Sequence, residues 1–550
     1  MIIKTSELLQ KCLELVGCRR IYTLPADLSL VLLSELEEAG IDVVSFPNEE
    51  AMIIAADIEA HLTGFSILIC TDGYSVSKLL NGLIAAKLRH SSVLVIAVTH
   101  DLSLKNSSLL NCHPQPSRLE VMMQSIGLDC ISVGALSTCD DFYNSFVKPQ
   151  VQQQPVVLTI TTHDVLQLRW DYDDNLENLV VSKHIKESVH ANIQLQLLLN
   201  NYPDMLLVFG NGVNRFRSKI SERYLKESVR QKYLLMPSAK GCLAETDSRF
   251  IGIHTGDFID DDVKEIIDSA NFVLLVEVED HELSPGFWKP FFGTSNWSLR
   301  EEYLANGKTV FNISKHMGLE YDGKYLKPLD WISVLFSSDS SINNIEPQRA
   351  TNIKKNISSL SRYEQVAFLL NSASAQRTLV IDVGISCLPF WSYFVGKDSH
   401  FIANSVWANM GFCFAAGVAA YKVYPEQELW IVCGDGVAAM SMQDMLMFVR
   451  ESIPVCIIIL DNNGYLTEKV KASGKFNKGF AIDWCAYAHS IGFNFTAKIG
   501  REDSLEVVFK KFVQKKAQQS LLWIDIPSNS MPKALENLMV WQRIKQSKNS

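Results

Sequence analysis

The residues best suited to chemistry lie in two short loops, GDG at 434–436 and NNG at 462–464. Asp435 offers a carboxylate oxygen, Asn462 an amide oxygen, and the chain at Gly464 a backbone carbonyl. Hard oxygens of this kind suit Mg²⁺, which usually combines a few protein ligands with water and substrate phosphates. The glycines beside Asp435 leave room for backbone N–H groups to approach a phosphate. The two loops therefore predict a site for a metal ion and a phosphate group.

The elements around these loops would place them side by side. The strand-like segment ELWIVC, residues 428–433, runs into the first loop, and PVCIIIL, residues 454–460, leads to the second. Between them, SMQD at 441–444 resembles a helix capping signature and precedes an apolar helical face. A strand–helix–strand unit normally sets its strands parallel, so both loops should lie at the carboxyl edge of one sheet. Taken singly, GDG and NG are common turns, and only their combination favours a binding site.

Length and composition indicate a globular chain with several domains. With 550 residues the chain is too long for a single core, and its 47% hydrophobic and 20% charged residues are ordinary. A net charge of −10 without a basic block argues against nucleic acid as a partner. The 12 cysteines form no CxxC pair and often lie in apolar runs, which indicates buried thiols in a reducing compartment. No apolar run reaches membrane-spanning length and no signal peptide is evident, so we expect a cytoplasmic protein without a membrane partner.

Short apolar strands alternate with helical patterns along almost the whole chain. This alternation predicts an α/β fold with parallel sheets. Polar segments near residues 162–188 and 337–355 interrupt it and are typical of linkers. We therefore expect three Rossmann-like, doubly wound α/β domains, over residues 1–165, 186–337 and 356–550.

The GDG loop, followed by a strand–helix–strand interval and an asparagine pair, resembles the diphosphate–metal motif of thiamine-diphosphate-dependent enzymes. The resemblance implies thiamine diphosphate and Mg²⁺ as cofactors, with pyrimidine-binding, middle structural and diphosphate-binding domains in that order. The residues it assigns to the cofactor at these loops are Gly434, Asp435, Gly436, Val437, Asn462 and Gly464. Of these, Asp435, Asn462 and Gly464 would be the metal ligands.

The segment PNEEAMIIAADIEAHLTG, residues 47–64, is similar to the family's glutamate segment and assigns that role to Glu49. In the family this carboxylate hydrogen-bonds the aminopyrimidine ring of thiamine and drives it to the imino form that generates the ylid nucleophile. Apart from the resemblance, Glu49 is an acidic residue that the dipole would favour at a helix N-terminus.

Further segments resemble one branch of the family, the pyruvate and indolepyruvate decarboxylases. In SVWANMGFCFAAGVAA, residues 405–420, Met410 would be the apolar wedge beneath the cofactor, and the Ala408 carbonyl would meet its 4′-amino group. LPADLSLVLL and NNGYLTEKV are similar to the segments that carry two acidic residues in this branch, here Asp27 and Glu468. The alternatives are a core methionine at Met410, a helix cap at Asp27 and an exposed helix charge at Glu468.

The resemblance implies non-oxidative decarboxylation of a small 2-oxo acid to an aldehyde and CO2, through a thiamine ylid and an enamine. Asp27 and Glu468 would face each other to handle the substrate carboxylate and proton transfer. It also implies a homodimer or homotetramer with active sites between subunits, so that Glu49 and Asp435 would come from different chains.

Three departures from the decarboxylase pattern leave other functions open. The branch carries a His-His pair after Leu-Leu, whereas this chain has Asn-Cys at 111–112. In the segment LLNCHPQPS the only imidazole is His113, one position late. A shift of one residue would place His113 at the second catalytic position of the pair, and the alternative is a structural histidine. Ile385 replaces a threonine near the diphosphate, and Val437 replaces a frequent serine after GDG. Loss of the His pair favours a carboligase of the acetolactate synthase type, while Glu468 opposes it. A third possibility is a catalytically degenerate homologue that only binds.

Overall fold

The structure of this chain is a computed structural model. It describes residues 2–536 except for 28, 72–73, 101–116, 135, 173–188, 221–223, 256–260, 280–298, 315–317, 322–323, 327–329, 337–359, 373–375, 393–398, 472–473, 515–516, 528–529 and 534. The chain divides into two compact units. The first unit is drawn from residues 1–185, 215–218 and 418–423, and the second from residues 186–214, 219–417 and 424–550.

The first unit is built around a six-stranded sheet in which every strand pairing is parallel. Its strands are β2 (Arg20–Thr23), β3 (Asp42–Ser45), β4 (Ser66–Thr71), β5 (Val93–Thr99), β6 (Asp129–Val133) and β7 (Val156–Thr161). They follow the order β3-β2-β4-β5-β7-β6. The helices are α1 (Thr5–Leu15), α2 (Leu30–Glu38), α3 (Glu49–Thr63), α4 (Tyr74–Leu88), α5 (Ser117–Ser125), α6 (Cys139–Gln152) and α7 (Thr162–Gln167). A small antiparallel ribbon pairs β1 (Ile2–Lys4) with β8 (Arg169–Asp171).

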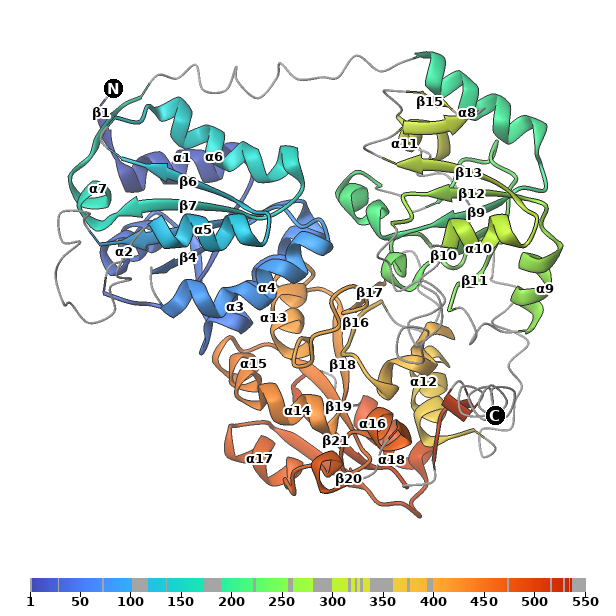
Figure 1. The fold of residues 1–550 in the computed structure, drawn as a ribbon. Coiled ribbons are helices and arrows are strands. Elements are labelled where there is room, and N and C mark those ends of the chain that lie inside the picture. Colours follow the sequence, from blue (N-terminus) through green and yellow to red (C-terminus); the bar gives the residue numbers. More distant parts are fainter. Residues whose placement is uncertain are drawn as a thin grey trace. The chain divides into compact units, whose positions relative to one another are not determined.

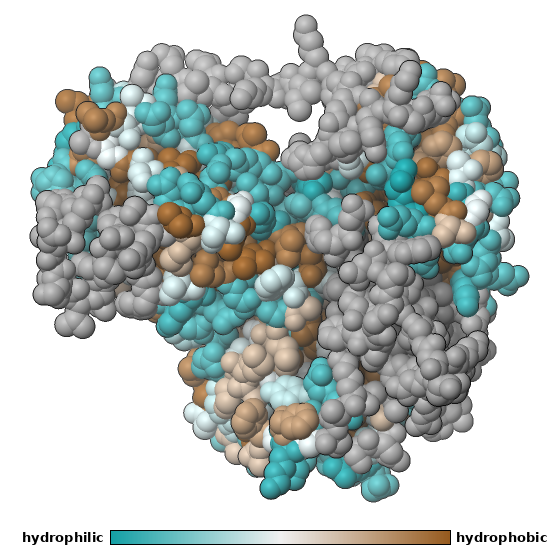
Figure 2. Space-filling view, in the orientation of Figure 1, coloured by the Kyte–Doolittle hydropathy of each residue, from teal (hydrophilic) through white to brown (hydrophobic). Residues whose placement is uncertain are grey.

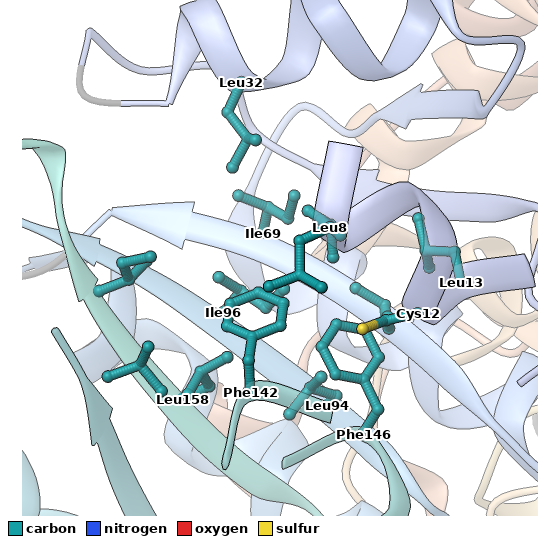
Figure 3. Packing of buried hydrophobic residues seen from close by; sticks show 14 of the residues in the cluster. Leu8, Cys12, Leu13, Leu32, Ile69, Leu94, Ile96, Phe142, Phe146 and Leu158 are labelled. Atoms are coloured by element: carbon teal, nitrogen blue, oxygen red, sulfur yellow. The ribbon is translucent and has the colours of Figure 1, made fainter. Parts of the chain in front are cut away.

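Helices cover both faces of this sheet, with α1 and α6 on one face and α3 and α4 on the other (Figure 1). The central strands β4 and β5 are buried along their whole length, as the apolar runs of a doubly covered parallel sheet must be. Figure 3 shows the first of these layers, where Leu8 of α1 and Phe142 and Phe146 of α6 pack against Leu94 and Ile96 of β5. The layer on the opposite face of the sheet contains α3, whose first residue is Glu49.

The second unit contains a mixed sheet of seven strands. Its strands are β9 (Leu206–Phe209), β10 (Tyr233–Leu235), β11 (Phe250–Ile253), β12 (Phe272–Val276), β13 (Thr309–Ser314), β14 (Gly318–Tyr321) and β15 (Lys324–Leu326). The order is β11-β10-β9-β12-β13-β14-β15, parallel as far as β13 and antiparallel beyond it. Helices around these strands in the chain are α8 (Val189–Asn201), α9 (Asp261–Ser269), α10 (Leu299–Ala305), α11 (Trp331–Leu335) and the 3₁₀ helices η3 (Asn211–Lys219) and η4 (Pro237–Ala239).

The same unit contains a second sheet, of six strands, that is parallel throughout. Its strands are β16 (Arg377–Ile381), β17 (His400–Ala403), β18 (Glu428–Gly434), β19 (Val455–Asp461), β20 (Phe495–Ile499) and β21 (Gln519–Asp525), in the order β17-β16-β18-β19-β21-β20. The helices around these strands in the chain are α12 (Arg362–Ser372), α13 (Cys413–Val423), α14 (Asp435–Ser441), α15 (Leu446–Arg450), α16 (Leu466–Lys471), α17 (Trp484–Ser490), α18 (Leu505–Val513), η8 (Ile385–Ser392), η9 (Met442–Met445) and η10 (Lys475–Asn477), and residues 418–423 of α13 belong to the first unit. Because β16, β18 and β19 are parallel neighbours, the residues that follow them share one edge of the sheet.

The predicted α/β class is confirmed, since three large sheets with parallel strands make up the described structure. The expected linkers fall largely on residues outside the described ranges, so the domain boundaries stay a prediction. The cysteines that the structure describes are all free, and most are buried. No helix in the described ranges combines the length and apolar character needed to cross a membrane.

One local expectation is confirmed only in part. The capping pattern predicted that a helix begins after Ser441, and Ser441 is the N-cap residue of η9, which α15 follows directly, but an additional helix, α14, already begins at Asp435. Ser441 makes no capping hydrogen bond, and its hydroxyl donates instead to the carbonyl of Val437, one turn earlier. The first loop is therefore shorter than expected, and Asp435 lies at the junction of strand and helix.

Candidate active site

Both loops of the predicted metal site meet at the carboxyl edge of the parallel sheet that contains β18 and β19. β18 ends at Gly434, and its register sets that residue opposite Leu460, near the end of β19. The Asp435 side chain is buried, and its Oδ2 accepts a hydrogen bond of 2.8 Å from the backbone N–H of Gly464. The structure thus joins the two loops that the sequence predicted to share one site.

Asn462 presents an unsatisfied oxygen in the second loop. Its Nδ2 donates to the hydroxyl of Tyr363 on α12 at 2.8 Å, which orients the amide. Its Oδ1 is buried and accepts no hydrogen bond from the described residues. A buried oxygen without a donor costs roughly 1–3 kcal/mol, and a bound cation would remove that cost. An amide oxygen beside the carboxylate of Asp435 is a donor set that fits Mg²⁺.

A cation at this edge would depend on few charged ligands. Within the described ranges no three His, Cys, Asp or Glu side chains converge as a metal site. The available oxygens are therefore the Asp435 carboxylate, the Asn462 amide and backbone carbonyls. Mg²⁺ tolerates this arrangement because it usually keeps several waters and takes further oxygens from substrate phosphates.

Gly464 is required by the backbone of its own loop. Its φ is +127°, a conformation that side-chain-bearing residues rarely adopt. A Cβ there would lie 2.0 Å from the carbonyl oxygen of Asn477 and 2.6 Å from the nitrogen of Gly479. The segment of Asn477 and Gly479 lies against the loop of Gly464, and the N–H of Tyr465 donates to the Asn477 carbonyl at 3.1 Å. This close approach fixes the loop that carries Asn462.

The electrostatic environment favours a cation beside Asp435. Burial, and then the nearby Asp461 carboxylate, raise the pKa of Asp435 from its ordinary value of 3.8 to about 6, although the N–H of Gly464 opposes the shift. Asp461 is itself held by the Nε1 of Trp523 at 2.9 Å and the N–H of Asn463 at 2.9 Å. Two carboxylates in a partly desolvated position repel each other, and a divalent cation would relieve that repulsion.

The loop between β17 and α13 contains Ala408 and Met410, the residues assigned to the cofactor ring. Ala408 has a φ of 59°, an uncommon backbone conformation for a residue with a side chain. Asn404 stabilises this turn, since its Oδ1 accepts from the N–H of Ala408 at 3.3 Å and its Nδ2 donates to the carbonyl of Asn409 at 2.8 Å. Met410 is only half-buried in the isolated chain, so it is not a fully packed core methionine. A turn held in a strained conformation is typical of functional sites.

Asp382 connects this loop to the end of β16, and the sequence analysis missed it. Its Oδ2 accepts from the backbone N–H of Cys413, the first residue of α13, at 2.9 Å. Complete burial raises the pKa of Asp382 to about 6, and the N–H groups of Cys413 and Val383 oppose that rise. Gly384 and Ser386 follow Asp382 closely in the chain. The hydroxyl of Ser386 is buried and has no hydrogen-bond partner in the described ranges. The signal that could have found Asp382 is its position directly after a strand of the same sheet.

Glu49 lies at the start of α3 in the first unit. The Asn48 side chain caps this helix by accepting from the N–H of Ala51 at 2.8 Å. The Glu49 side chain is 1% exposed, and each carboxylate oxygen has a partner on α4. Ser75 Oγ donates to Oε1 at 2.9 Å, and Lys78 Nζ donates to Oε2 at 3.1 Å. Sequence reasoning missed both partners, because they depend on how two helices pack.

The remaining predicted residues are less constrained in the isolated chain. Asp27 is exposed, and Ser29, not Asp27, is the N-cap residue of α2, so the helix-cap interpretation of Asp27 is wrong. Glu468 is an exposed residue of α16. Val437 is buried within α14. The preceding residue, Gly436, leaves room for the ring of Tyr465, because a Cβ on Gly436 would lie 2.7 Å from Cε1 of that ring. His113, together with the Asn-Cys pair at 111–112, lies outside the described residues.

Comparison with known proteins finds two family models that match this chain. The model described as "Thiamine pyrophosphate enzyme, N-terminal TPP binding domain" matches residues 3–120, the part that contains Glu49. The model described as "Thiamine pyrophosphate enzyme, C-terminal TPP binding domain" matches residues 382–525, which contain both loops at the sheet edge.

The chain is also similar to curated proteins over most of its length, at low identity. It is 21% identical to pyruvate decarboxylase isozyme 3 of Saccharomyces cerevisiae, over 83% of each chain. It is 22% identical to the probable pyruvate decarboxylase Pdc101 of Schizosaccharomyces pombe, over 99% of this chain and 96% of the relative. The putative thiamine pyrophosphate-containing protein YdaP of Bacillus subtilis is 21% identical, over 87% of this chain and 84% of the relative.

Proposed function

Because the chain belongs to the thiamine pyrophosphate enzymes, we propose that it is a 2-oxo acid decarboxylase that uses thiamine diphosphate and Mg²⁺. Relatives named pyruvate decarboxylase support this reaction, and so does Glu468 in the segment that resembles the decarboxylases. The observation that carries the proposal is the contact between the two loops, where the buried carboxylate of Asp435 accepts from the N–H of Gly464. Beside it lies the amide oxygen of Asn462, which has no hydrogen-bond donor among the described residues.

The residues at the sheet edge would hold the cofactor in the following way. Asp435, Asn462 and the backbone at Gly464 would ligate Mg²⁺, and the backbone from 434 to 437 would bind the diphosphate. Ser386 supports this assignment, because its buried hydroxyl lacks a partner in the described ranges and is a suitable donor to a phosphate oxygen.

Bound thiamine diphosphate supplies a nucleophilic carbon for the 2-oxo group and an electron sink for the bond to the carboxylate. Glu49 would hold and move the proton at the ring nitrogen of the aminopyrimidine, as a general acid–base group. The turn at Ala408 would present its carbonyl to the amino group of that ring, and Met410 would pack beneath the cofactor. The burial of Glu49 keeps bulk water from competing for this proton.

Three further groups would act on the substrate. We propose that Asp27, Glu468 and His113 orient the carboxylate of a small 2-oxo acid and supply the proton that completes the aldehyde. The exposure of Asp27 and Glu468 in the isolated chain supports a role in which substrate or a second subunit covers them.

We also propose that the enzyme is a homodimer or homotetramer with active sites between its subunits, in the cytoplasm. Large apolar side chains in segments near the candidate site are exposed in the isolated chain, namely Trp407, Met440, Phe476 and Phe480. Figure 2 shows hydrophobic areas among the hydrophilic ones on one face of the chain. Exposed apolar area of this kind is typical of surfaces that a partner covers. The free thiols support a reducing compartment.

The proposal is tested by supplying thiamine diphosphate, Mg²⁺ and a panel of small 2-oxo acids, and by measuring CO2 and free aldehyde. A decarboxylase releases both in equal amounts. Thermal unfolding with and without the cofactor gives an independent readout, because a ligand that binds only the folded protein raises its stability by about 2.7 kcal/mol at 100 times the Kd. Absence of any such rise would refute both the decarboxylase and the carboligase.

The role of Glu49 has its own test with a matched control. Glu49→Gln keeps the size of the side chain but removes the carboxylate, so turnover should fall at least about 100-fold while cofactor binding persists. Glu50→Gln changes the neighbouring glutamate, which is exposed and bonded to Asn81, and should leave turnover within about twofold. Undiminished turnover of Glu49→Gln would remove Glu49 from this role.

A carboligase is the second candidate, and the replacement of the His-His pair by Asn-Cys at 111–112 favours it. In that case CO2 would appear without a matching amount of free aldehyde, and a second carbonyl compound would be consumed. A degenerate homologue that only binds would show cofactor-dependent stabilisation and no CO2 from any 2-oxo acid.

A further inference from the structure

We infer that Lys78 is a displaceable counter-ion of Glu49, a positioning residue that holds the carboxylate until the pyrimidine ring of the cofactor takes its place. The inference rests on the proposed function, because it assumes that Glu49 meets the cofactor. It goes beyond that function in assigning a role to a lysine on α4 that controls how tightly the cofactor binds.

The first observation is that the Glu49 carboxylate has no unused oxygen in the ligand-free chain. Ser75 occupies Oε1 and Lys78 occupies Oε2. The Glu49 side chain is 1% exposed, and a buried carboxylate needs such partners because desolvation of its charge is costly. Because each oxygen already accepts one hydrogen bond, a cofactor ring nitrogen that shares a proton with Glu49 competes with one of these two partners for the carboxylate.

The second observation identifies which partner yields. Ser75 is buried with its hydroxyl fixed at the start of α4, whereas the Lys78 side chain is 59% exposed. A lysine ammonium is strongly hydrated and sits on a flexible stem, so water readily replaces its contact with a carboxylate. Ion pairs with an exposed lysine are also weak. The Lys78 contact is the one that opens, and Ser75 keeps Glu49 oriented.

The third observation separates this role from helix packing. A second contact of the same kind joins α3 and α4 only one residue further along α3, where Asn81 Nδ2 donates to Glu50 Oε1 at 2.6 Å. That contact is exposed and involves a glutamate without a proposed role. If Lys78 served only to join the two helices, its removal and the removal of Asn81 would have equivalent effects.

The test is a calorimetric titration of thiamine diphosphate, at fixed Mg²⁺, into the full-length wild type and variants. Lys78→Met removes the competing cation, so the Kd should fall about fivefold, which corresponds to about 1 kcal/mol. Lys78→Arg keeps a cation and should bind within about twofold of the wild type, as should the matched control Asn81→Leu. Lys78→Gln gives a second neutral variant, and far-ultraviolet circular dichroism checks that every variant folds.

A second ligand identifies the contact involved. An analogue in which CH replaces the pyrimidine nitrogen assigned to Glu49 has no need to displace Lys78, so the gap in affinity between the wild type and Lys78→Met should disappear. Equal or weaker cofactor binding by both neutral variants would overturn the inference, and so would a gap that persists with the analogue. No binding of thiamine diphosphate to the wild type would overturn the proposed function as well, which distinguishes the two failures.

Discussion

Asp435→Asn is expected to stabilise the ligand-free protein while it destroys the metal site. In the folded chain burial and Asp461 raise the pKa of Asp435 from its ordinary value of 3.8 to about 6. Each pKa unit corresponds to 1.36 kcal/mol, so ionisation of this carboxyl costs the fold about 3 kcal/mol. The side chain is almost fully buried, so little of this cost is screened by solvent. An asparagine keeps an oxygen for the N–H of Gly464 and carries no charge.

The pH dependence follows from the sign of this shift. Because the folded carboxyl binds its proton more tightly than the unfolded one, the wild type loses stability as the pH rises from about 4 to about 6. Above about 6 the loss is complete, and below about 4 both states are protonated and the loss vanishes. Asp435→Asn should therefore gain up to about 3 kcal/mol at pH 7 and nothing below pH 4.

The assay is urea unfolding between pH 4 and pH 8, with a chelator present and without thiamine diphosphate. Asp483→Asn is a matched control, because Asp483 is exposed and caps α17, a role that asparagine fills equally well. With Mg²⁺ and the cofactor present the order should reverse, since only the wild type gains stability from binding. A ligand-free Asp435→Asn that is less stable than the wild type at pH 7, or a difference independent of pH, would refute the reasoning.

Two other perturbations follow from contacts in the second unit. Gly464→Ala should abolish the stabilisation by Mg²⁺ and cofactor and cost more than about 2 kcal/mol in urea unfolding, because its Cβ would lie 2.0 Å from the Asn477 carbonyl. Gly307→Ala, at φ +77° and with no atom of the described residues within 4 Å of its Cβ, should cost only about 1 kcal/mol. Lys240→Met should cost about 3–5 kcal/mol, because it leaves the buried carboxylate of Glu245 without the ammonium now 2.7 Å away. The double variant with Glu245→Leu should recover most of that loss, and equal stability of the single and double variants would contradict the argument.

The fold and one half of the candidate site could be predicted from local pattern. The strands predicted at 428–433 and 454–460 are observed as Glu428–Gly434 and Val455–Asp461, because continuous apolar runs specify buried parallel strands. Since such strands pair side by side, the contact between Asp435 and Gly464 follows from the order of elements. This part of the prediction depends only on the order of strands and helices in the chain. That order does not determine the residue at which α14 begins.

The partners of the catalytic candidates were not predictable in the same way. Ser75 and Lys78 reach Glu49 only because α3 and α4 pack against each other, and nothing in the letters around them marks that contact. Asp382 likewise holds the start of α13 from a strand end 31 residues away in the chain. Side-chain contacts between separate elements depend on helix rotation and packing, which sequence periodicity alone does not fix.

The ligand-free chain carries three costs at one edge of a single sheet, and together they favour a binding site over ordinary loops. The Oδ1 of Asn462, which has no donor among the described residues, costs roughly 1–3 kcal/mol. The ionised Asp435 costs about 3 kcal/mol at pH 7, and Ala408 adds a strained turn. Loops that only connect strands have no need of these features. If the side chains of Asn462 and Asp435 faced solvent, water would hydrogen-bond the amide oxygen and hydrate the carboxylate, and neither cost would arise. A divalent cation would supply a partner for Asn462 and a counter-charge for Asp435 at once. The same ion therefore turns two destabilising groups into ligands. The metal site and the destabilisation by ionised Asp435 in the absence of metal thus have the same cause, and the Asp435→Asn experiment tests both.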